Sequence, residues 1–545
     1  MTRPTDIEAT QFDALIIGAG INGAGIARDA ALRGLKVLLV DKGDICGGTS
    51  GWSTRLIHGG LRYLEHGELR LVRESLRERE RLLRLATHLV RPLPMLIPIY
   101  KGARRGRLQI RAGMWLYDLL SLDKTLARHR MLSRAATLKR AHGLDPSGLV
   151  GAALYYDAQV EYAERLVVEN ALSAREHGAT VLTYARAERL LIEDGAVLGV
   201  ELKDLLSGGS YRARASYTLN VAGPWVDEVI ASQPSPQLIG GTKGSHLIVD
   251  KFPGAPADAL YVEAAADGRP FFIIPWNSKY LIGTTDTRYD GDLDRVAATE
   301  EEISYLLNET NRVIPAAGLA RNSVLYTYAG IRPLPFVGQQ KESGITRRHF
   351  IHEHAPALRN FASVIGGKLT TYRSLAEEAV DLLLKKLAHT PVPSRTAELP
   401  LPGAETKDFQ AFQRELQERY DNVPASLLER LFRIYGTRAD AVLKLADEDA
   451  ELLHAFDAET GAIGAELVLA FREEMAETLA DSLQRRTMVG LNSHAGLNAV
   501  EAAARVARNH LGWSAERAVR EVAAYLEYVE RFHPASAATE ATTDE

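Results

Sequence analysis

The chain has 545 residues, of which 46% are hydrophobic and 25% charged, values that are ordinary for a globular protein and exclude a disordered one. The formal charge is −5, from 65 Lys and Arg against 70 Asp and Glu, so overall electrostatics do not recruit nucleic acid. Cys46 is the single cysteine, which excludes an intrachain disulfide and Cys-rich metal sites and predicts a reducing compartment. The length favours three or four domains, at about 150 residues each.

Membrane-spanning segments are not predicted. No apolar run reaches the roughly 18 residues that a spanning helix needs, and the nearest rival, Gly461 to Phe471, is short and contains Glu466. Asp6 and Glu8 precede the first apolar segment, which argues against a signal peptide. We therefore expect a cytoplasmic protein that is soluble or attached peripherally to a membrane.

The N-terminal region predicts a strand–turn–helix–strand unit. Phe12 to Ile17 is an apolar run typical of a buried parallel strand, and the turn Gly18-Ala-Gly-Ile-Asn-Gly23 follows it. Helical spacing then runs from Ala24 to Leu32, and a second apolar run from Lys36 to Val40 ends at Asp41. Together these elements form a unit of about 30 residues.

The glycines of this turn indicate a nucleotide site. Gly18 permits the tight turn, Gly20 lets the backbone approach a pyrophosphate, and Gly23 lets helix and strand pack closely. The helix N-terminus offers N–H groups to the phosphates, and Asp41 offers a carboxylate to a ribose diol. The fingerprint does not distinguish NAD from FAD, but the hydroxyl- and glycine-rich stretch from Thr49 to Leu64 favours a flavin.

The remaining elements follow in order. Ile57 to Leu85 predicts long helices, and three prolines then break the pattern. Residues 154–178 predict a strand and a helix, residues 179–202 predict a hairpin around Asp194-Gly195, and a further strand ends at Asn220. An antiparallel sheet is predicted at 240–331 and a strand–glycine–helix unit at 364–387. A proline-rich linker at 389–403 leads to an all-helical region at 404–535.

Several of these segments together resemble aerobic glycerol-3-phosphate dehydrogenase, the FAD-dependent, quinone-linked family. The matching motifs lie in family order from the N-terminus to about residue 375. They are Gly18-Ala-Gly-Ile-Asn-Gly-Ala-Gly-Ile-Ala27, Leu56-Ile-His-Gly-Gly-Leu-Arg-Tyr-Leu-Glu-His66, Asn220-Val-Ala-Gly-Pro-Trp225, Lys243-Gly-Ser-His246, Ile282-Gly-Thr-Thr-Asp286, Tyr328-Ala-Gly-Ile-Arg-Pro333 and Gly366-Gly-Lys-Leu-Thr-Thr-Tyr-Arg373.

The resemblance implies an α/β fold like that of D-amino-acid oxidase. A Rossmann-like FAD-binding domain is expected from residues 12–90, 150–225 and 330–390, and an antiparallel-sheet substrate domain from 91–149 and 226–329. An all-α domain is expected at 404–535. The implied FAD contacts are Gly18, Gly20, Asn22, Gly23, Asp41, Thr49, Ser50, Leu56, His58, Gly59, Ala187, Gly223, Lys368 and Thr370.

The implied substrate is glycerol 3-phosphate, whose phosphate requires cations and whose 2-hydroxyl requires a proton acceptor near flavin N5. Arg62, Arg332, Arg347 and Lys368 are the candidate cations, each in or beside a matched motif. The alternative for each arginine is an ordinary pairing with a surface carboxylate. Tyr63 is a further candidate for substrate contact.

His58 is the first candidate for the general base, because imidazole titrates near physiological pH and Gly59 and Gly60 leave room for flavin and substrate. Its alternative role is packing or hydrogen bonding against the flavin. His246 is the rival base, and Lys243 is expected to help orient either group. Arg332 and Lys368 complete the expected catalytic set, and no metal is expected.

The family delivers electrons to membrane quinone, so a membrane contact is also expected. Lys101-Gly-Ala-Arg-Arg-Gly-Arg107, Arg111 and the apolar run Met114-Trp-Leu-Tyr117 are compatible with a basic amphipathic patch on anionic lipid. A solvated loop before an ordinary core helix is the alternative. We expect peripheral attachment at the inner face of the cell membrane.

Other functions remain open at this stage. The enzymatic alternative is an oxygen-using glycerol-3-phosphate oxidase, or a related amine or hydroxy-acid oxidase. A flavin-binding interaction protein, with C-terminal helices that dock a partner, is the non-enzymatic alternative. A homodimer is expected.

Overall fold

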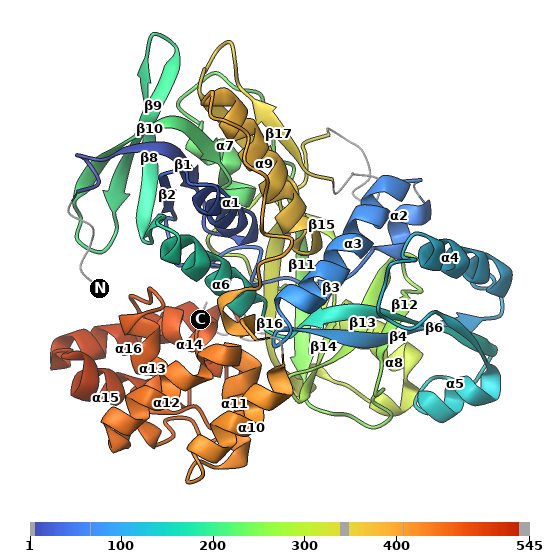
Figure 1. Ribbon diagram of the computed structural model, residues 1–545. Coiled ribbons are helices and arrows are strands. Elements are labelled where there is room, and N and C mark those ends of the chain that lie inside the picture. The colour runs from blue at the N-terminus through green and yellow to red at the C-terminus, as the bar shows by residue number, and fades with distance from the viewer. Residues whose placement is uncertain (1–5, 66, 338–347, 407, 534–545) are drawn as a thin grey trace, which may run out of the picture.

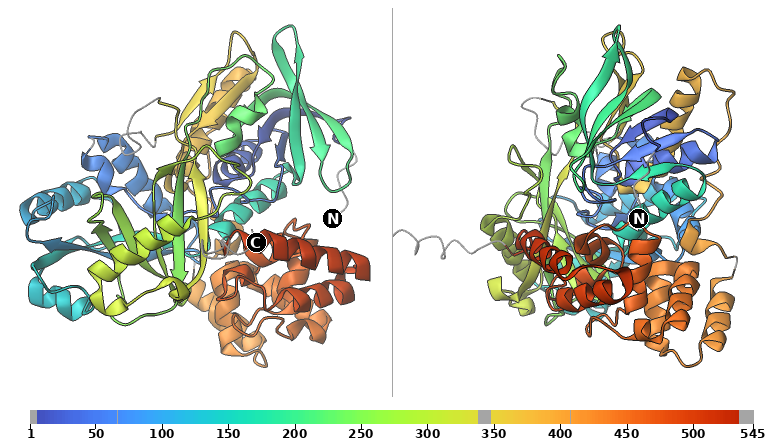
Figure 2. Two further views of the ribbon diagram at one scale, coloured as in Figure 1. Left: turned by 180° about the vertical axis from the view of Figure 1, so that it is seen from behind. Right: turned by 90° about the vertical axis from the view of Figure 1, so that its left-hand side faces the viewer.

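The computed structural model describes residues 6–65, 67–337, 348–406 and 408–533, and Figures 1 and 2 show their arrangement. Within these residues the strands form one sheet of eight strands and one of ten. The C-terminal helices, orange to red, lie below the first sheet in Figure 1, with the second sheet to their right. No helix among the described residues is both long and apolar enough to cross a membrane.

The first sheet contains the predicted N-terminal unit. Its strand order is β17-β18-β10-β1-β2-β7, with β9 beside β10 and β8 beside β9. The central strands run parallel. The strands are β1 (Gln11–Ile17), β2 (Val37–Val40), β7 (Thr180–Leu182), β8 (Ala185–Glu193), β9 (Ala196–Asp204), β10 (Ser210–Asn220), β17 (Phe350–Glu353) and β18 (Phe361–Ile365).

Helices α1 (Ile21–Leu32), α6 (Ala163–Glu176) and α9 (Tyr372–Lys386) pack together beside this sheet (Figure 1). Helix α1 approaches α9 closely at Gly25, where an added Cβ would lie 2.7 Å from Cδ2 of Tyr372. Strand β2 is buried at every residue, which explains its uninterrupted apolar sequence. The predicted hairpin forms from β8 and β9, with Asp194 and Gly195 at positive φ in the turn.

The second sheet is mostly antiparallel and includes the predicted 240–331 region. Its order is β15-β11-β14-β13-β12-β4-β6-β3, with β16 beside β11 and β5 beside β6. Helix α8 (Glu300–Val313) packs on it. The strands are β3 (Leu56–Ile57), β4 (Val90–Tyr100), β5 (Arg130–Ser133), β6 (Leu149–Val160), β11 (Thr242–Val249), β12 (Ala259–Glu263), β13 (Pro270–Trp276), β14 (Lys279–Gly283), β15 (Thr287–Arg288) and β16 (Val324–Arg332).

Strand β4 was not predicted, because Pro92, Pro94 and Pro98 lie inside it. The three prolines sit at even positions, so their missing N–H groups lie along the same edge of the strand. The antiparallel pairing with β6 extends along nearly the whole of β4, whereas the pairing with β12 involves only Met95 and Leu96 within the described residues. The prolines are therefore compatible with the strand, because the edge that they occupy carries little of its pairing.

Four helices between β3 and β6 flank the second sheet: α2 (Leu61–Glu65), α3 (Leu69–Leu85), α4 (Arg107–Leu119) and α5 (Arg134–Arg140). Beyond the linker, the C-terminal region is helical as predicted. Its α-helices are α10 (Phe409–Arg419), α11 (Ala425–Tyr435), α12 (Ala439–Glu448), α13 (Gly464–Arg472), α14 (Leu479–Arg485), α15 (Val500–Leu511) and α16 (Ala515–Glu530).

The division into domains remains a prediction. Strand β6 is hydrogen-bonded to β3, β4 and β5 in the second sheet. We therefore propose that the boundary expected at residue 150 lies after β6, near Val160, so that β6 belongs to the same domain as β4 and β5.

Candidate active site

Two adjoining cavities lie where the carboxyl ends of β1, β2, β10 and β18 meet β16 of the second sheet. The larger has a volume of about 680 Å³ and the smaller about 180 Å³. They form one continuous site because they share part of their lining, which consists of Thr49, Trp52, Ser53, Gly330, Pro333, Gly367, Lys368 and Leu369. The carboxyl edge of a parallel sheet is the usual position for a nucleotide in such folds.

The glycine turn lines one end of the larger cavity. Gly18 has φ +110°, and an added Cβ would lie 2.6 Å from the carbonyl oxygen of Val221, so a larger residue would be strained and crowded there. Gly20 precedes helix α1 and lines the cavity itself. The Ile21 N–H donates to Oγ of Ser50 at 3.0 Å, which ties the turn to the later hydroxyl-rich loop.

Asp41 stands at the end of β2, as predicted. Its Oδ2 accepts a hydrogen bond from the Ala19 N–H at 2.6 Å, and its Oδ1 accepts one from the Gly43 N–H at 2.8 Å. Burial raises the pKa of Asp41, while these two backbone hydrogen bonds act in the opposite direction. The carboxylate thus fixes the turn while it lines the larger cavity.

The larger cavity fits the predicted FAD. Its volume lies within the range of about 300–1,000 Å³ that is usual for ligand pockets. Oδ1 of Asn22 is buried and has no hydrogen-bond partner among the described residues, although Nδ2 donates to the Gly366 carbonyl at 3.3 Å. The N-terminus of α1 adds a partial positive charge for phosphates, and Asp41 supplies an acceptor for a diol. Backbone donors and an acceptor therefore line the same wall.

Arg332 lines the smaller cavity, at the end of β16. Its Nη1 lies 3.1 Å from Oδ1 of Asp286, and its Nη2 donates to Oγ1 of Thr284 and to the carbonyl oxygen of Thr285, each at 3.1 Å. Gly244 makes room for the guanidinium, because an added Cβ there would lie 2.3 Å from Nη2. These contacts hold a positive charge in a fixed orientation at the cavity wall.

His246 is buried in the wall of the same cavity. Its Nε2 lies 2.9 Å from Oγ1 of Thr54, and its ring stacks on Tyr328 with 4.7 Å between centroids. Burial, together with the positive charges of Arg332 and Arg55, holds the pKa of His246 well below its ordinary value. The imidazole is therefore neutral at physiological pH.

His58 follows strand β3 and lines the smaller cavity, half-buried. Its backbone N–H donates to Oγ1 of Thr370 at 3.2 Å. Lys368 lines both cavities; its Nζ donates to Oγ of Ser75 at 3.0 Å and lies 4.5 Å from the centroid of the Tyr63 ring. Residues 58, 63, 246, 332, 368 and 370 are thus brought together from four separate parts of the chain.

Most of the predicted residues line one or both cavities. In the larger are Gly18, Gly20, Asn22, Asp41, Thr49, Ser50, Ala187, Gly223 and Lys368, and in the smaller Thr49, Leu56, His58, Tyr63, His246, Arg332, Lys368 and Thr370. Gly23 and Gly59 lie behind the walls, where an added Cβ would meet the Gly18 carbonyl oxygen at 1.8 Å or the Tyr117 hydroxyl at 2.5 Å. Both are close-packing positions.

Two predicted cations do not line either cavity. Lys243 is buried on the opposite side of β11, where its Nζ lies 2.9 Å from Oε2 of Glu302. Arg62 is on α2 and lies near Tyr261. Burial raises the pKa of Tyr261, and the positive charge of Arg62 acts in the opposite direction. Arg347 lies outside the described residues. Lys243 and Arg62 therefore remain substrate ligands by prediction only.

The C-terminal helices contribute to the larger cavity, which the sequence did not predict. Arg531 and Phe532 line it, and the Phe532 carbonyl accepts a hydrogen bond from the Thr327 N–H at 2.9 Å. Near the same cavity, buried Asp44 pairs with Nε of Arg485 at 2.6 Å and with Nη2 of Arg486 at 2.8 Å. Although burial opposes it, these arginines hold the pKa of Asp44 below its ordinary value.

Sequence reasoning also missed three residues near the smaller cavity. Trp52 lines both cavities, Thr54 contacts His246, and Asp286 orients Arg332. Thr54 and Trp52 lie inside the stretch from Thr49 to Leu64 that favours a flavin, and this position in the sequence could have identified them as site residues. Asp286 lies in the matched motif Ile282 to Asp286, but its pairing with Arg332 depends on the sheet. Among the described residues, no cluster of His, Cys, Asp and Glu is suited to hold a metal ion.

Comparison with known families agrees with this geometry. A model of the FAD dependent oxidoreductases matches residues 13–373, and a model of the C-terminal domain of alpha-glycerophosphate oxidase matches residues 394–518. The first match spans both sheets, and the second falls in the helical region.

Named relatives cover almost the whole chain. A glycerol-3-phosphate dehydrogenase of Synechocystis sp. is 47% identical over 541 residues, which is 96% of this chain and 98% of that protein. The aerobic glycerol-3-phosphate dehydrogenase of Staphylococcus haemolyticus is 34% identical over 88% of this chain and 87% of its own length. A solved glycerol-3-phosphate dehydrogenase of Bacillus halodurans, complexed with FAD, has a TM-score of 0.79 and 29% identity, covering 97% of this chain and 96% of that chain. The chain therefore belongs to the family of FAD-dependent glycerol-3-phosphate dehydrogenases.

Proposed function

We propose that this enzyme oxidises sn-glycerol 3-phosphate to dihydroxyacetone phosphate and passes the electrons to membrane quinone. The observation that carries the proposal is the smaller cavity, which adjoins the FAD-sized one and is lined by Arg332 and Lys368 together with His58. A volume of about 180 Å³ suits a small polyol phosphate, and two cations suit its dianionic phosphate.

Each residue has a distinct role in this proposal. Arg332, oriented by Asp286 and Thr284, binds the phosphate through hydrogen bonds between charged groups. Lys368 adds a second positive charge at the boundary of the two cavities. When bound, FAD supplies an acceptor at N5 for the hydride that leaves C2 of the substrate. The walls formed by Trp52 and Gly330 restrict the space for water.

His58 is the proposed general base, which takes the proton of the 2-hydroxyl at a ring nitrogen. The rival, His246, is disfavoured because its burial and the charge of Arg332 penalise the imidazolium form. Nε2 of His246 is also committed to Thr54. His246 instead suits a neutral hydrogen-bonding role in the wall.

A test of the proposed reaction uses the purified holoenzyme without oxygen. Addition of glycerol 3-phosphate should bleach the oxidised flavin absorbance within the turnover time, whereas glycerol, which lacks the phosphate, should bleach it far more slowly. An unchanged flavin spectrum with glycerol 3-phosphate would contradict the proposal. It would favour the non-enzymatic, flavin-binding alternative instead.

The oxidase alternative differs in the electron acceptor. In air, with glycerol 3-phosphate and no quinone, we expect slow reoxidation and little peroxide, and addition of a soluble quinone should accelerate turnover. Stoichiometric peroxide without quinone would establish an oxygen-using oxidase. Bleaching by an amine such as glycine, in place of the phosphate, would establish the amine-oxidase alternative.

Peripheral membrane contact is proposed through helix α4. Of the predicted apolar run, Met114 and Tyr117 are buried and belong to the core. The exposed apolar side chains are instead Leu108, Trp115, Leu119 and Leu122, at exposures of 80%, 55%, 60% and 69%. Exposed basic residues lie before and among them, namely Lys101, Arg104, Arg107 and Arg111. This arrangement supports a surface that binds anionic lipid headgroups and buries apolar side chains at the interface.

The membrane contact is tested by co-sedimentation with vesicles of phosphatidylglycerol and phosphatidylcholine. The double variant Trp115→Ser, Leu119→Ser should lose most of the vesicle-bound fraction, and high salt should release much of the wild type. The matched control is Val519→Ser, Leu526→Ser, which removes two exposed apolar side chains from α16. Equal binding by both double variants would exclude α4 as the contact.

The expected homodimer also remains a proposal. Sedimentation equilibrium separates a 59.8 kDa monomer from a particle of twice that mass. A monomer at micromolar concentration would contradict it.

A further inference from the structure

The backbone at His58 and Gly59 is held by two side-chain hydroxyls. Strand β3 pairs with β6 only at Leu56 and Ile57 within the described residues, so the ladder ends just before this segment. The next N–H, of His58, donates to the Thr370 hydroxyl at 3.2 Å. The N–H of Gly59 donates to the hydroxyl of Tyr117 at 2.9 Å, with a longer hydrogen bond of 3.5 Å to Oδ1 of Asp157. Side-chain hydroxyls therefore accept the hydrogen bonds of these two N–H groups, where backbone pairing with β6 has ended.

Glycine at position 59 is explained by this contact. An added Cβ would lie 2.5 Å from the Tyr117 hydroxyl and 2.6 Å from Cδ2 of Leu76. The backbone thus rests directly on the tyrosine, which reaches it from helix α4. A displacement of the Tyr117 hydroxyl would be transmitted to the peptide that follows His58.

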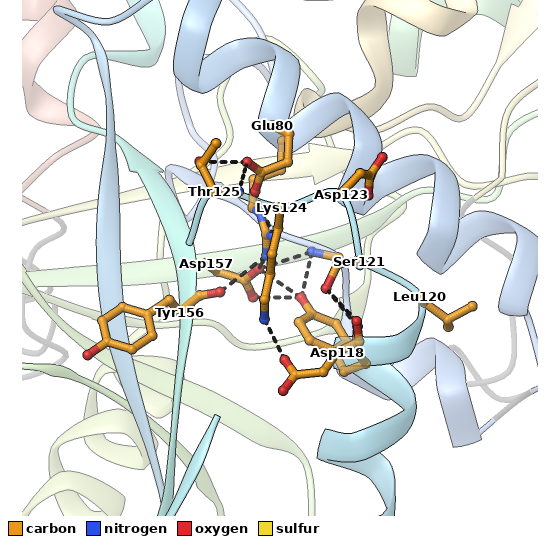
Figure 3. Close-up of polar contacts among 12 residues, drawn as sticks. Glu80, Asp118, Leu120, Ser121, Asp123, Lys124, Thr125, Tyr156 and Asp157 are labelled. Atoms are coloured by element: carbon orange, nitrogen blue, oxygen red, sulfur yellow. Dashed lines mark hydrogen bonds and ion pairs between the residues drawn. The ribbon is translucent and has the colours of Figure 1, made fainter. Parts of the chain in front are cut away.

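Tyr117 is itself fixed by a buried ion pair. Its hydroxyl lies 2.8 Å from each carboxylate oxygen of Asp157, on strand β6. Nη1 of Arg79 donates to Asp157 at 2.6 Å, and Nη2 donates to Glu80 at 2.9 Å. Figure 3 shows the surroundings of this pair, with Asp157 on its strand, Glu80 beside Thr125, and Lys124 directed at Asp118.

The donors and acceptors in this chain have one consistent direction. An ionised carboxylate only accepts, so Asp157 must accept the proton of the Tyr117 hydroxyl. The hydroxyl is then left with its lone pairs, and one of them accepts the N–H of Gly59. Burial and the charge of Asp157 raise the pKa of Tyr117 well above its ordinary value, so this proton is retained at neutral pH.

We propose that Tyr117 is a positioning residue for the reaction: oriented by Asp157 and Arg79, its hydroxyl fixes the amide of Gly59 and thereby holds His58 at the wall of the smaller cavity. The inference rests on the proposed function, in which His58 takes the substrate proton. It connects the interior side of helix α4 to the reacting end of the site.

The experiment compares Tyr117→Phe with Tyr155→Phe in the full-length holoenzyme. Phenylalanine keeps the ring and removes only the hydroxyl. Tyr155 is the matched control, because it is a buried tyrosine that packs edge-on against Tyr117 at 5.9 Å between centroids. Two quantities are measured: the rate constant of flavin reduction by glycerol 3-phosphate without oxygen, and hydrogen exchange of the peptide that contains residues 57–60.

We expect Tyr117→Phe to lower the reduction rate constant by about 10-fold or more, since misplacement of a reacting group by about 1 Å costs up to about 100-fold. The KM for glycerol 3-phosphate should change less than about threefold, because Arg332 is untouched. Exchange at Gly59 should become at least about 10-fold faster. Tyr155→Phe should change none of these quantities.

Either of two results would overturn the inference: wild-type reduction and exchange in Tyr117→Phe, or equal losses in both variants. The second result would mean that the two tyrosines serve the core only. If Tyr117→Phe fails to fold, hydrogen exchange in the wild type decides, because rapid exchange at Gly59 is incompatible with the proposed contact. A wild type that glycerol 3-phosphate does not reduce would contradict the proposed function, while the exchange measurement would still test the position of Gly59.

Discussion

The two ends of the active site are built in different ways. At the nucleotide end, backbone N–H groups, glycines and Asp41 line the wall, and much of it comes from residues 17–53. At the reacting end, side chains line the wall, and they come from β3, α2, β11, β16 and the turn after β18. The part of the nucleotide end formed by residues 17–53 depends on local geometry, although segments after β10 and β18 and the C-terminal region complete its wall. A site made from side chains of distant segments depends on the whole fold.

This comparison predicts that the largest single effect lies at the reacting end. Replacement of His58 by alanine should slow flavin reduction by about 10²–10⁴-fold while FAD remains bound, because a general base is lost and the nucleotide wall is intact. Single-turnover absorbance without oxygen measures the rate. His454→Ala, at an exposed position in the C-terminal region, is the control. An unchanged rate constant in His58→Ala would remove His58 from the base role.

The next largest effect should appear where the helical region anchors the nucleotide end. Arg486→Met leaves buried Asp44 with Arg485 but without its second arginine, and breaking a buried ion pair costs about 3–5 kcal/mol. Denaturant unfolding measures this loss, and FAD retention on gel filtration should fall with it. Arg419→Ala breaks an exposed pair with Asp440 and should cost at most about 1 kcal/mol. Equal losses would show that Asp44 needs only one partner.

Substrate binding should respond less strongly. Arg332→Ala removes charged hydrogen bonds that contribute roughly 1.5–3 kcal/mol, so the dissociation constant for glycerol 3-phosphate should rise by about 10- to 150-fold. Titration of the flavin spectrum with a non-reducing phosphate analogue measures it. Arg62→Ala is the informative partner variant, since Arg62 does not line either cavity. A larger effect in Arg62→Ala than in Arg332→Ala would restore Arg62 as the main phosphate ligand.

The smallest effect concerns pH. The pKa of His246 in the folded protein is held well below its ordinary value near 6.5. Below pH 6.5, His246 therefore binds a proton in the unfolded chain but not in the folded protein. Stability is therefore fully present above pH 6.5 and falls as the pH drops, by up to about 1.4 kcal/mol per unit from this group. Unfolding free energies of the wild type and His246→Gln between pH 5 and 7 measure the difference. Parallel curves would mean that His246 has the same pKa in the folded and the unfolded protein.

Much of the nucleotide end was predictable from sequence because its determinants are local. The spacing of Gly18, Gly20 and Asp41 fixes the turn, and the apolar runs on either side fix the strands. The predicted family, FAD cofactor and overall architecture are confirmed. Arg531 and Phe532 were not predictable, because they reach the cavity from the end of the helical region, about 510 residues beyond the glycine turn.

The reacting end shows where local patterns fail. Lys243 and His246 share one short motif, yet they lie on opposite sides of β11 because side chains alternate along a strand. Arg332 was identified by resemblance, whereas its orientation by Asp286 required the pairing of β11 with both β15 and β16.

The contact between Phe532 and Thr327 has a consequence for biosynthesis. Because Phe532 completes a wall that begins at Ile17, a ribosome must have released the chain through this residue before the pocket can enclose its dinucleotide. The last wall to close over the cofactor is thus built from a segment that is synthesised after the strands of both sheets.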